Sequence, residues 1–337
     1  MIRRTGLSLV VAFVVAAVAG STSAATPIDG STEAAAQAGV VRLMAVGDVV
    51  LGQSIGRRII RNGPGTPWAK VSTTLKEADV FLANLECPIS SRGTPWPGKT
   101  YVLRAPPAAA AALVAGGVDI VNLANNHTLD YGVTAFTDTL ATLDDLGVRH
   151  IGGGRDEASA HAPVILERNG LRIGFLGYAL YFAPGTKGAW VAGPSKPGLV
   201  AGTPELVSHE VAALKPQVDV VVVTFHGGRT NSSAPDAKVR AFTRAATAAG
   251  AALVIGHHPH VLQGYRREGN TLVAYSLGNF VFAYFSGVQN DSAILDVTLS
   301  ANGVESFNWI PVVIEGAFPR PARGPEIDRI MARLKPI

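Results

Sequence analysis

Short apolar runs that end in polar side chains recur along this chain, and they constrain its fold more than any other feature. Each run contains Val or Ile, as expected of a buried strand. In open α/β sheets, sites form at the carboxyl ends of strands, so we expect the side chains that end these runs to meet at one edge. Five runs end in potential metal ligands: Asp48, Glu86, Asn126 with His127, His226, and His258 with His260.

The apolar patterns indicate an α/β fold in which residues 40–337 form one domain. Alternating runs at 292–299 and 307–314 predict antiparallel strands beside parallel ones. The region 181–202 is a Pro/Gly-rich insertion, either a lid or a disordered excursion. Predicted helices are 105–115, 133–146, 236–249 and 326–334, and the predicted parallel strands are 40–46, 78–83, 118–124, 171–180, 218–225, 251–255 and 271–275.

The first residues have the three parts of a secretory signal peptide, for which we expect the bounds 1–25. Arg3 and Arg4 precede an apolar run, and small residues follow it. The run is shorter than the roughly 20 residues of a membrane-spanning helix, so an uncleaved anchor is the minor alternative. Residues 26–39, rich in Ala, Ser, Thr and Gly, predict a flexible spacer. The chain is therefore expected to be secreted or associated with the cell envelope.

Charge and cysteine content exclude several classes of function. The formal net charge of +4 would fall to +2 once Arg3 and Arg4 are removed, because no other charged residue precedes Asp29. Such a charge gives no indication of nucleic-acid binding. Cys87 is the single cysteine, which excludes an intramolecular disulfide and a thiolate-rich zinc site.

Three of the eight histidines lie within the segment Gly256-His257-His258-Pro259-His260. In an extended segment, alternate side chains share a face, so His258 and His260 can converge on one ion. His257 is then predicted to point away. A His-rich polar loop without a metal is the alternative interpretation.

The five strand ends together supply two carboxylates, an amide and three imidazoles besides His127. Such donors suit zinc, manganese or iron, and they exceed what one tetrahedral zinc requires. We therefore expect two divalent ions about 3.5 to 4 Å apart, which would make hydroxide available for hydrolysis. His127, out of phase with Asn126 along an extended chain, is predicted to protonate the leaving group. Taken singly, Asp48 could instead be an ordinary helix cap and His226 a structural histidine.

These residues also carry a family resemblance. The motifs in order are Gly47-Asp48, Asn84-Leu85-Glu86, Asn125-Asn126-His127, His226, Gly256-His257-His258-Pro259-His260 and Ser276-Leu277-Gly278-Asn279-Phe280. Over residues 42–282 they resemble the bacterial capsule synthesis protein CapA family, also called poly-gamma-glutamate biosynthesis proteins. That family is similar to calcineurin-like metallophosphoesterases, which implies a four-layer αββα sandwich. The resemblance implies catalysis by His127 and metal binding by Asp48, Glu86, Asn126, His226, His258 and His260.

The chain departs from the family pattern at two places. Phosphoesterases usually have a histidine two residues after the first aspartate, where this chain has Val50. Relatives commonly read His-Trp-Gly-x-Glu at the fourth motif, where this chain reads His226-Gly227-Gly228-Arg229-Thr230. Arg229 would suit an anionic substrate or lie solvated at the surface, and Asn84, which shares a face with Glu86, is the other candidate for substrate binding.

Three functions remain open on the sequence. The first is an exported CapA-type protein acting in the synthesis, modification or anchoring of an anionic envelope polymer such as poly-gamma-glutamate, with envelope biosynthesis proteins as partners. The second is a secreted phosphomonoesterase or phosphodiesterase that acts on a phosphate-containing small molecule. The third is a non-catalytic component that binds the polymer, for which the missing histidine at Val50 is the main support.

Overall fold

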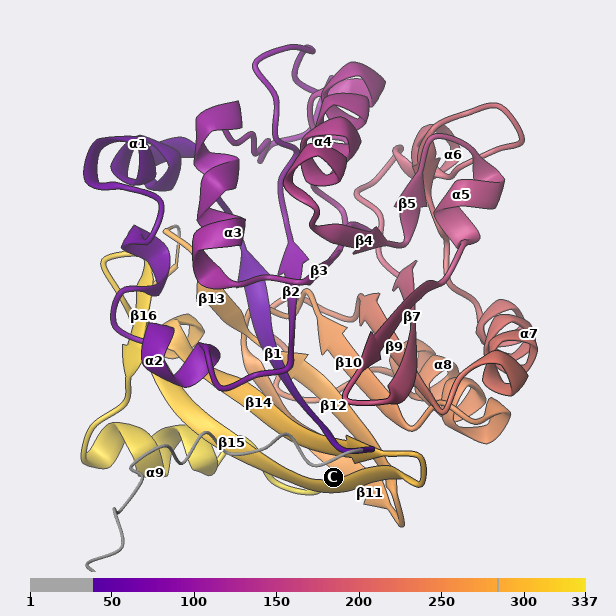
Figure 1. Ribbon diagram of the computed structural model, residues 1–337. Coiled ribbons are helices and arrows are strands. Elements are labelled where there is room, and N and C mark those ends of the chain that lie inside the picture. The colour runs from indigo at the N-terminus through magenta and orange to yellow at the C-terminus, as the bar shows by residue number, and fades with distance from the viewer. Residues whose placement is uncertain (1–38, 284) are drawn as a thin grey trace, which may run out of the picture. The chain divides into compact units, whose positions relative to one another are not determined.

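Two β-sheets stacked face to face form the centre of the fold (Figure 1). The computed structural model describes residues 39–283 and 285–337. The predicted signal peptide and all but the last residue of the predicted spacer lie outside the described residues. Within the described part of the chain, no helix combines the length and apolar character needed to cross a membrane.

The first sheet has the order β16-β15-β14-β1-β2-β3-β4, with β13 also pairing with β1. Strands β1 to β4 are parallel, whereas β14 pairs antiparallel with β1 and continues into an antiparallel hairpin. The predicted antiparallel strands are therefore confirmed. The bounds are β1 Val41–Val49, β2 Val80–Leu85, β3 Ile120–Asn122, β4 Arg149–Ile151, β13 Asn279–Val281, β14 Asp291–Ser300, β15 Gly303–Glu315 and β16 Phe318–Pro321.

The second sheet has the order β11-β12-β10-β9-β7-β6, with four parallel strands between antiparallel edges. The small β5–β8 pair, Gly153–Gly154 with Gly198–Leu199, stands apart from both sheets. The bounds in the second sheet are β6 Val164–Arg168, β7 Leu171–Ala179, β9 Val220–His226, β10 Leu253–His257, β11 Leu262–Glu268 and β12 Thr271–Leu277.

Helices cover the outer faces of both sheets. The helices α1 to α4 pack on the first sheet, and α7 and α8 pack on the second. The bounds are α1 Gln53–Asn62, α2 Ser72–Leu75, α3 Ala111–Gly116, α4 Gly132–Leu146, α5 Glu157–His161, α6 Lys187–Trp190, α7 Pro204–Leu214, α8 Ala237–Ala249 and α9 Pro325–Met331. Short 3₁₀-helices span Thr66–Trp68, Pro107–Ala110, Lys215–Gln217 and Gly287–Asn290.

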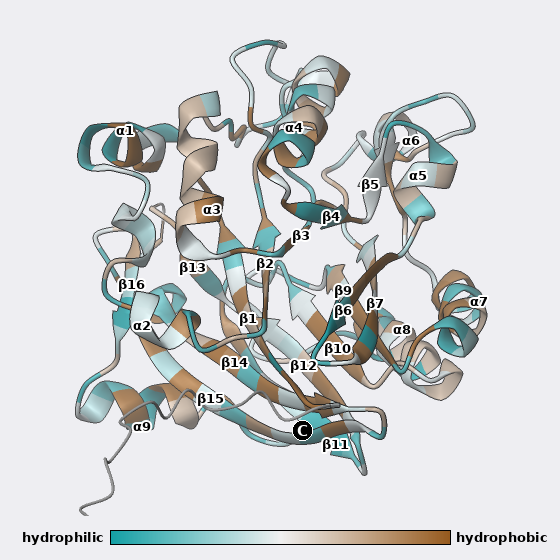
Figure 2. Cartoon of the chain, in the orientation of Figure 1, coloured by the Kyte–Doolittle hydropathy of each residue, from teal (hydrophilic) through white to brown (hydrophobic). Residues whose placement is uncertain are grey.

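Side-chain alternation along the strands explains this layering. In β9, Val220 and Val222 face the core between the sheets, whereas Val221 and Val223 face α7 and α8. A strand buried on both faces needs a continuous apolar run, which the sequence provides. In Figure 2, β14 and β15 instead alternate between hydrophobic and hydrophilic colours, as expected where one face meets solvent. The four-layer αββα sandwich that the family resemblance implies is confirmed.

The end of β1 is fixed in position because its backbone lies close to the backbone at Gly278. The amide of Asp48 donates to the carbonyl oxygen of Gly278 at 3.0 Å. A Cβ atom on Gly47 would lie 2.1 Å from that same oxygen, so only glycine fits there. The strand extends to Val49 instead of ending at 46 as predicted, with an irregular register at this point. Asp48 is therefore held by β-structure on both sides.

Candidate metal centre

The predicted site residues come from the carboxyl ends of strands in both sheets. Four of these residues lie at or just after the ends of strands β1, β2 and β3 of the first sheet, and three lie at or just after the ends of β9 and β10 of the second sheet. All of these side chains are buried, although every one of them is polar or charged. In chain order they are Asp48, Glu86, Asn126, His127, His226, His258 and His260.

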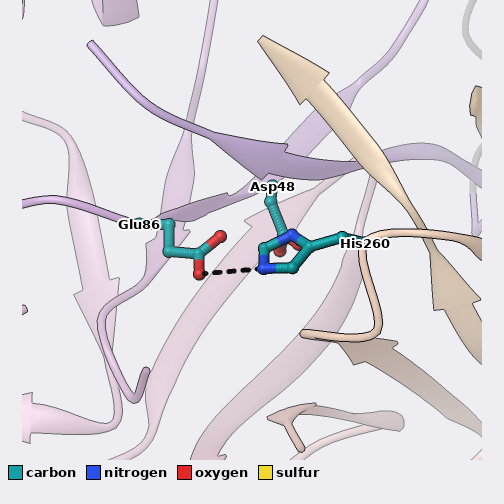
Figure 3. A group of neighbouring side chains, drawn as sticks. All are labelled: Asp48, Glu86 and His260. Atoms are coloured by element: carbon teal, nitrogen blue, oxygen red, sulfur yellow. Dashed lines mark ion pairs between the residues drawn. The ribbon is translucent and has the colours of Figure 1, made fainter. Parts of the chain in front are cut away.

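One group of three residues has the spacing of a metal site. The ligand atoms of Asp48, Glu86 and His260 all lie within 4.8 Å of one another. His260 Nδ1 lies 3.2 Å from Asp48 Oδ2, and its Nε2 lies 3.9 Å from Glu86 Oε1. Figure 3 shows the three side chains pointing toward one another. Two carboxylates and an imidazole in this arrangement could hold one divalent cation.

A second group lies on the other side of Glu86. His226 Nε2 is 3.6 Å from Glu86 Oε1, 2.7 Å from Asn126 Oδ1 and 3.1 Å from His258 Nδ1. His226 therefore faces the same carboxylate that the first group uses, and it contacts an amide oxygen and a second imidazole. Glu86 occupies the position that a carboxylate shared by two ions would need.

Unpaired buried atoms show that the donor set fits a cation. Among the residues that the structure describes, Asp48 Oδ2 and both carboxylate oxygens of Glu86 have no hydrogen-bond partner. Buried carboxylate oxygens without partners are costly, and coordination of a metal ion would satisfy them. The chemistry of the donors thus agrees with the metal centre that the sequence predicts.

The two carboxyl groups differ in their preferred protonation state. Burial raises the pKa of Glu86 well above its usual range, and the charge of Asp48 adds to this effect. Burial also acts to raise the pKa of Asp48, but contact with His260 outweighs it and holds that pKa below its usual value. A cation between the two groups would favour the ionised form of both.

Three imidazoles, those of His226, His257 and His258, are neutral near pH 7. Burial, followed by the charges of neighbouring imidazoles, lowers the pKa of His226 well below its usual value. Burial is also the main cause that lowers the pKa of His257 to about 4 and that of His258 to about 3. Neutral imidazole is the form that binds metals, so no proton has to be displaced.

His127 lies beside the two groups, with 3.9 Å between its Nε2 and Glu86 Oε1. Its Nδ1 lies 2.6 Å from Asp130 Oδ2. This contact assigns a proton to Nδ1 and leaves Nε2 facing the site. Burial lowers the pKa of His127, and the hydrogen bond with Asp130 acts against that decrease. The ring is therefore oriented by a carboxylate in the manner of a catalytic acid or base.

Lys99 is a buried cation behind this pair that the sequence patterns did not predict. Its ammonium group pairs with Asp130 Oδ1 and donates to the backbone carbonyl of Asn126 at 2.5 Å. Asp130 was missed as well, although its position three residues after His127 within a turn is a usable signal. Lys99 lies in the Pro/Gly-rich loop of residues 90–99, where no spacing predicts a contact.

The predicted orientation of His257 is wrong. Its Nδ1 lies 3.6 Å from Asp48 Oδ1, so the ring points toward the site and not away from it. The prediction assumed an extended chain, but His258 and His260 have φ values of 99° and 57°. These left-handed conformations break the alternation after β10, so three histidines of this segment reach the site.

The two residues predicted to contact substrate differ in position. Asn84 is completely buried, and its amide nitrogen lies 2.8 Å from Asp48 Oδ1 and 3.2 Å from His226 Nδ1. These contacts suit a residue that orients the site better than one that binds a substrate. Arg229 is exposed in the loop after β9. Val50, at the position where phosphoesterases usually have a histidine, packs in the core beneath α1 to α4.

Aromatic side chains border the site. Tyr181 stacks on His258 with 4.2 Å between ring centroids. On the other side, Phe285 lies 4.8 Å from His260, measured in the same way. The 181–202 insertion is ordered and forms α6 and β8. Because it begins with Tyr181, this insertion forms one edge of the site.

Comparison with known proteins identifies relatives. The family model described as bacterial capsule synthesis protein PGA_cap matches residues 42–284. The capsule biosynthesis protein CapA of Bacillus anthracis is 29% identical over 283 residues, which cover 82% of this chain and 68% of that protein. The PGA biosynthesis protein CapA of Bacillus subtilis is 29% identical over 280 residues, which cover 82% of this chain and 73% of that protein.

Among solved structures, the chain is similar to the NAD nucleotidase of Haemophilus influenzae. The TM-score is 0.47 at 13% sequence identity, and the match covers 87% of this chain and 55% of the nucleotidase chain.

Proposed function

Because the chain belongs to the bacterial capsule synthesis protein PGA_cap family, we propose that it is a metal-dependent enzyme of the cell envelope. Its substrate would be an anionic polymer, such as poly-gamma-glutamate, or a precursor of that polymer. The reaction would be hydrolysis or transfer, in the service of synthesis, modification or anchoring of the polymer. The names of both Bacillus relatives refer to capsule or PGA biosynthesis, which supports this substrate class.

One observation carries the proposal. Glu86 has two buried carboxylate oxygens without hydrogen-bond partners among the described residues, and His226 and His260 face it from the second sheet. Asp48 and His260 would hold one divalent ion with Glu86, and Asn126, His226 and His258 would hold a second. Manganese, zinc and iron all suit such nitrogen and oxygen donors.

The chain's own residues have distinct tasks in the proposed reaction. When bound, the ions would lower the pKa of a water molecule and polarise the substrate oxygens. His127, oriented by Asp130, would take up the proton of the attacking water at Nε2 and pass it to the leaving group. Lys99 would fix Asp130 in place through its ion pair. Arg229, exposed at the edge, would attract the negative charge of the substrate.

A buried His127–Asp130 pair favours catalysis over simple polymer binding, since binding alone does not need an oriented acid. It equally suits a second candidate function, that of a secreted phosphomonoesterase or phosphodiesterase. The two functions share the proposed metal centre and differ in the group attacked. Activity toward an aryl phosphate but not toward poly-gamma-glutamate would favour the second candidate.

The proposal is tested by loading the purified protein with manganese, zinc or iron and removing the excess. We expect two ions per chain by elemental analysis, and cleavage of poly-gamma-glutamate or of an aryl phosphate that stops when a chelator is added. Bound metal without turnover of either substrate would support a polymer-binding component instead. Absence of metal from the loaded protein would contradict the proposal as a whole.

We also propose that the chain is exported with removal of residues 1–25. N-terminal sequencing of secreted material should then begin at Thr26, or at Ala25 where cleavage falls one residue earlier, because the small residues from 22 to 25 fit the cleavage pattern at both places. Recovery of protein that still begins with Met1 in the membrane fraction would show that the segment serves as an anchor.

A further inference from the structure

We propose that His257 supplies a nitrogen ligand to the ion held by Asp48, Glu86 and His260. This inference rests on the proposed metal centre and adds a fourth protein ligand to its first group. The supporting observations are the place of His257 in β10, the unpaired state of its ring and its distance to Asp48.

The sheet register directs His257 toward the site. It is the last residue of β10 and pairs in parallel register with His226, the last residue of β9. Leu253 and Ile255, two and four positions earlier, face the core between the sheets. By alternation, His257 continues this inward face at the point where the strand ends.

The ring of His257 is buried without a partner. It is 0% exposed, and neither nitrogen has a hydrogen-bond partner among the residues that the structure describes. Most buried polar side chains in proteins are paired, so an imidazole unpaired at both nitrogens calls for an explanation. A cation beside Asp48 would use the lone pair of the nitrogen that faces it.

The approach of His257 to Asp48 brings it within reach of an ion held there, and binding would draw its ring toward the three ligand atoms of the first group, which already lie within 4.8 Å of one another. His257 Nδ1 lies 3.6 Å from Asp48 Oδ1. His260 Nδ1 donates to Asn279 Oδ1, and its other ring nitrogen, Nε2, lies 3.9 Å from Glu86 Oε1. Ligands about 2.1 Å from a metal with tetrahedral angles are separated by roughly 3.4 Å. An ion at the carboxylate of Asp48 would therefore lie near both imidazoles.

The inference also assigns separate tasks to the three clustered histidines. His257 and His260 would bind the ion at Asp48, whereas His258, whose Nδ1 lies 3.1 Å from His226 Nε2, would bind the other. Val50 faces the core and provides no ligand. His257 would bring the first group to four protein ligands without a side chain from that position.

The test compares His257→Leu and His257→Asn with the parent, with His258→Ala, and with His161→Asn. His161 pairs with Glu210 outside the site and serves as the histidine control. Metal content, affinity by chelator competition, the visible spectrum of the cobalt-loaded protein and the melting temperature with and without metal are measured. Asparagine keeps a polar group near the position of Nδ1, so this variant guards against failure of the leucine variant to fold.

We expect both His257 variants to lower the affinity for one ion by about 10²-fold or more, beyond the usual effect of losing an indirect contact. The cobalt spectrum should change, and the stabilisation by metal should shrink. An unchanged affinity and spectrum would overturn the inference, as would a melting temperature lowered equally with and without metal. If the parent binds metal and the His257 variants bind it with the same affinity and spectrum, only this inference fails. If the parent binds none, the proposed function fails with it.

Discussion

Replacing Glu86 with glutamine is expected to remove both ions and to reduce turnover by about 10³-fold or more, since metal ions contribute several kcal/mol to such reactions. Glu86 Oε1 lies 3.6 Å from His226 and 3.9 Å from His260, so one carboxylate serves both groups. Glutamine has nearly the same shape but lacks the negative charge. The measurements are metal content, turnover and melting temperature.

The same variant makes a second comparison possible without metal. Burial raises the pKa of Glu86, so its ionised form is disfavoured in the metal-free protein. Glutamine resembles the protonated acid, and metal-free Glu86→Gln should therefore melt no lower than the metal-free parent. The matched control is Glu210→Gln, which lies outside the site and should keep its metal. Two ions retained in Glu86→Gln would refute a shared carboxylate.

Exchange of His127 for alanine should have the opposite pattern, with metal content preserved and activity lowered by about 10² to 10⁴-fold. The ring is 3.9 Å from Glu86 and is held by Asp130, which suits a proton donor. The loss should be larger for an ester with an alkyl leaving group than for an aryl ester, because an aryl group leaves without prior protonation. Activity is measured on both substrates and metal by elemental analysis. Loss of metal together with activity would make His127 a ligand.

Local patterns predicted much of the secondary structure. The valine run of β9 and the helical spacing of α4 and α8 depend on near neighbours along the chain, so they can be read directly. The strand ends that carry ligands were also predictable, because a polar residue after an apolar run is visible in sequence. Assignment of these strands to two sheets came from the family resemblance, since no local pattern specifies which strands pair.

The details of the site depend on contacts between distant segments. Lys99 reaches Asp130 from a loop without regular spacing. The convergence of His257 with His258 and His260 could not be predicted because the chain leaves the extended conformation at His258 and again at His260. Positive φ values at residues other than glycine cost about 1 to 3 kcal/mol and persist only where surrounding contacts impose them.

The pairing of β14 with β1 has a consequence for how the chain folds. Val41 at the start of β1 lies opposite Leu299, so β1 meets this neighbour only when most of the chain is available, whereas its other neighbour, β2, is near in sequence. The family match ends at residue 284, before β14 begins. Without the last three strands of the first sheet, β1 would present an unpaired edge, and the inner core would lose Leu295 and Trp309. Pairing of this edge of the strand that carries Asp48 is therefore a non-local event, and exchange between chains at the open edge is expected while synthesis is incomplete.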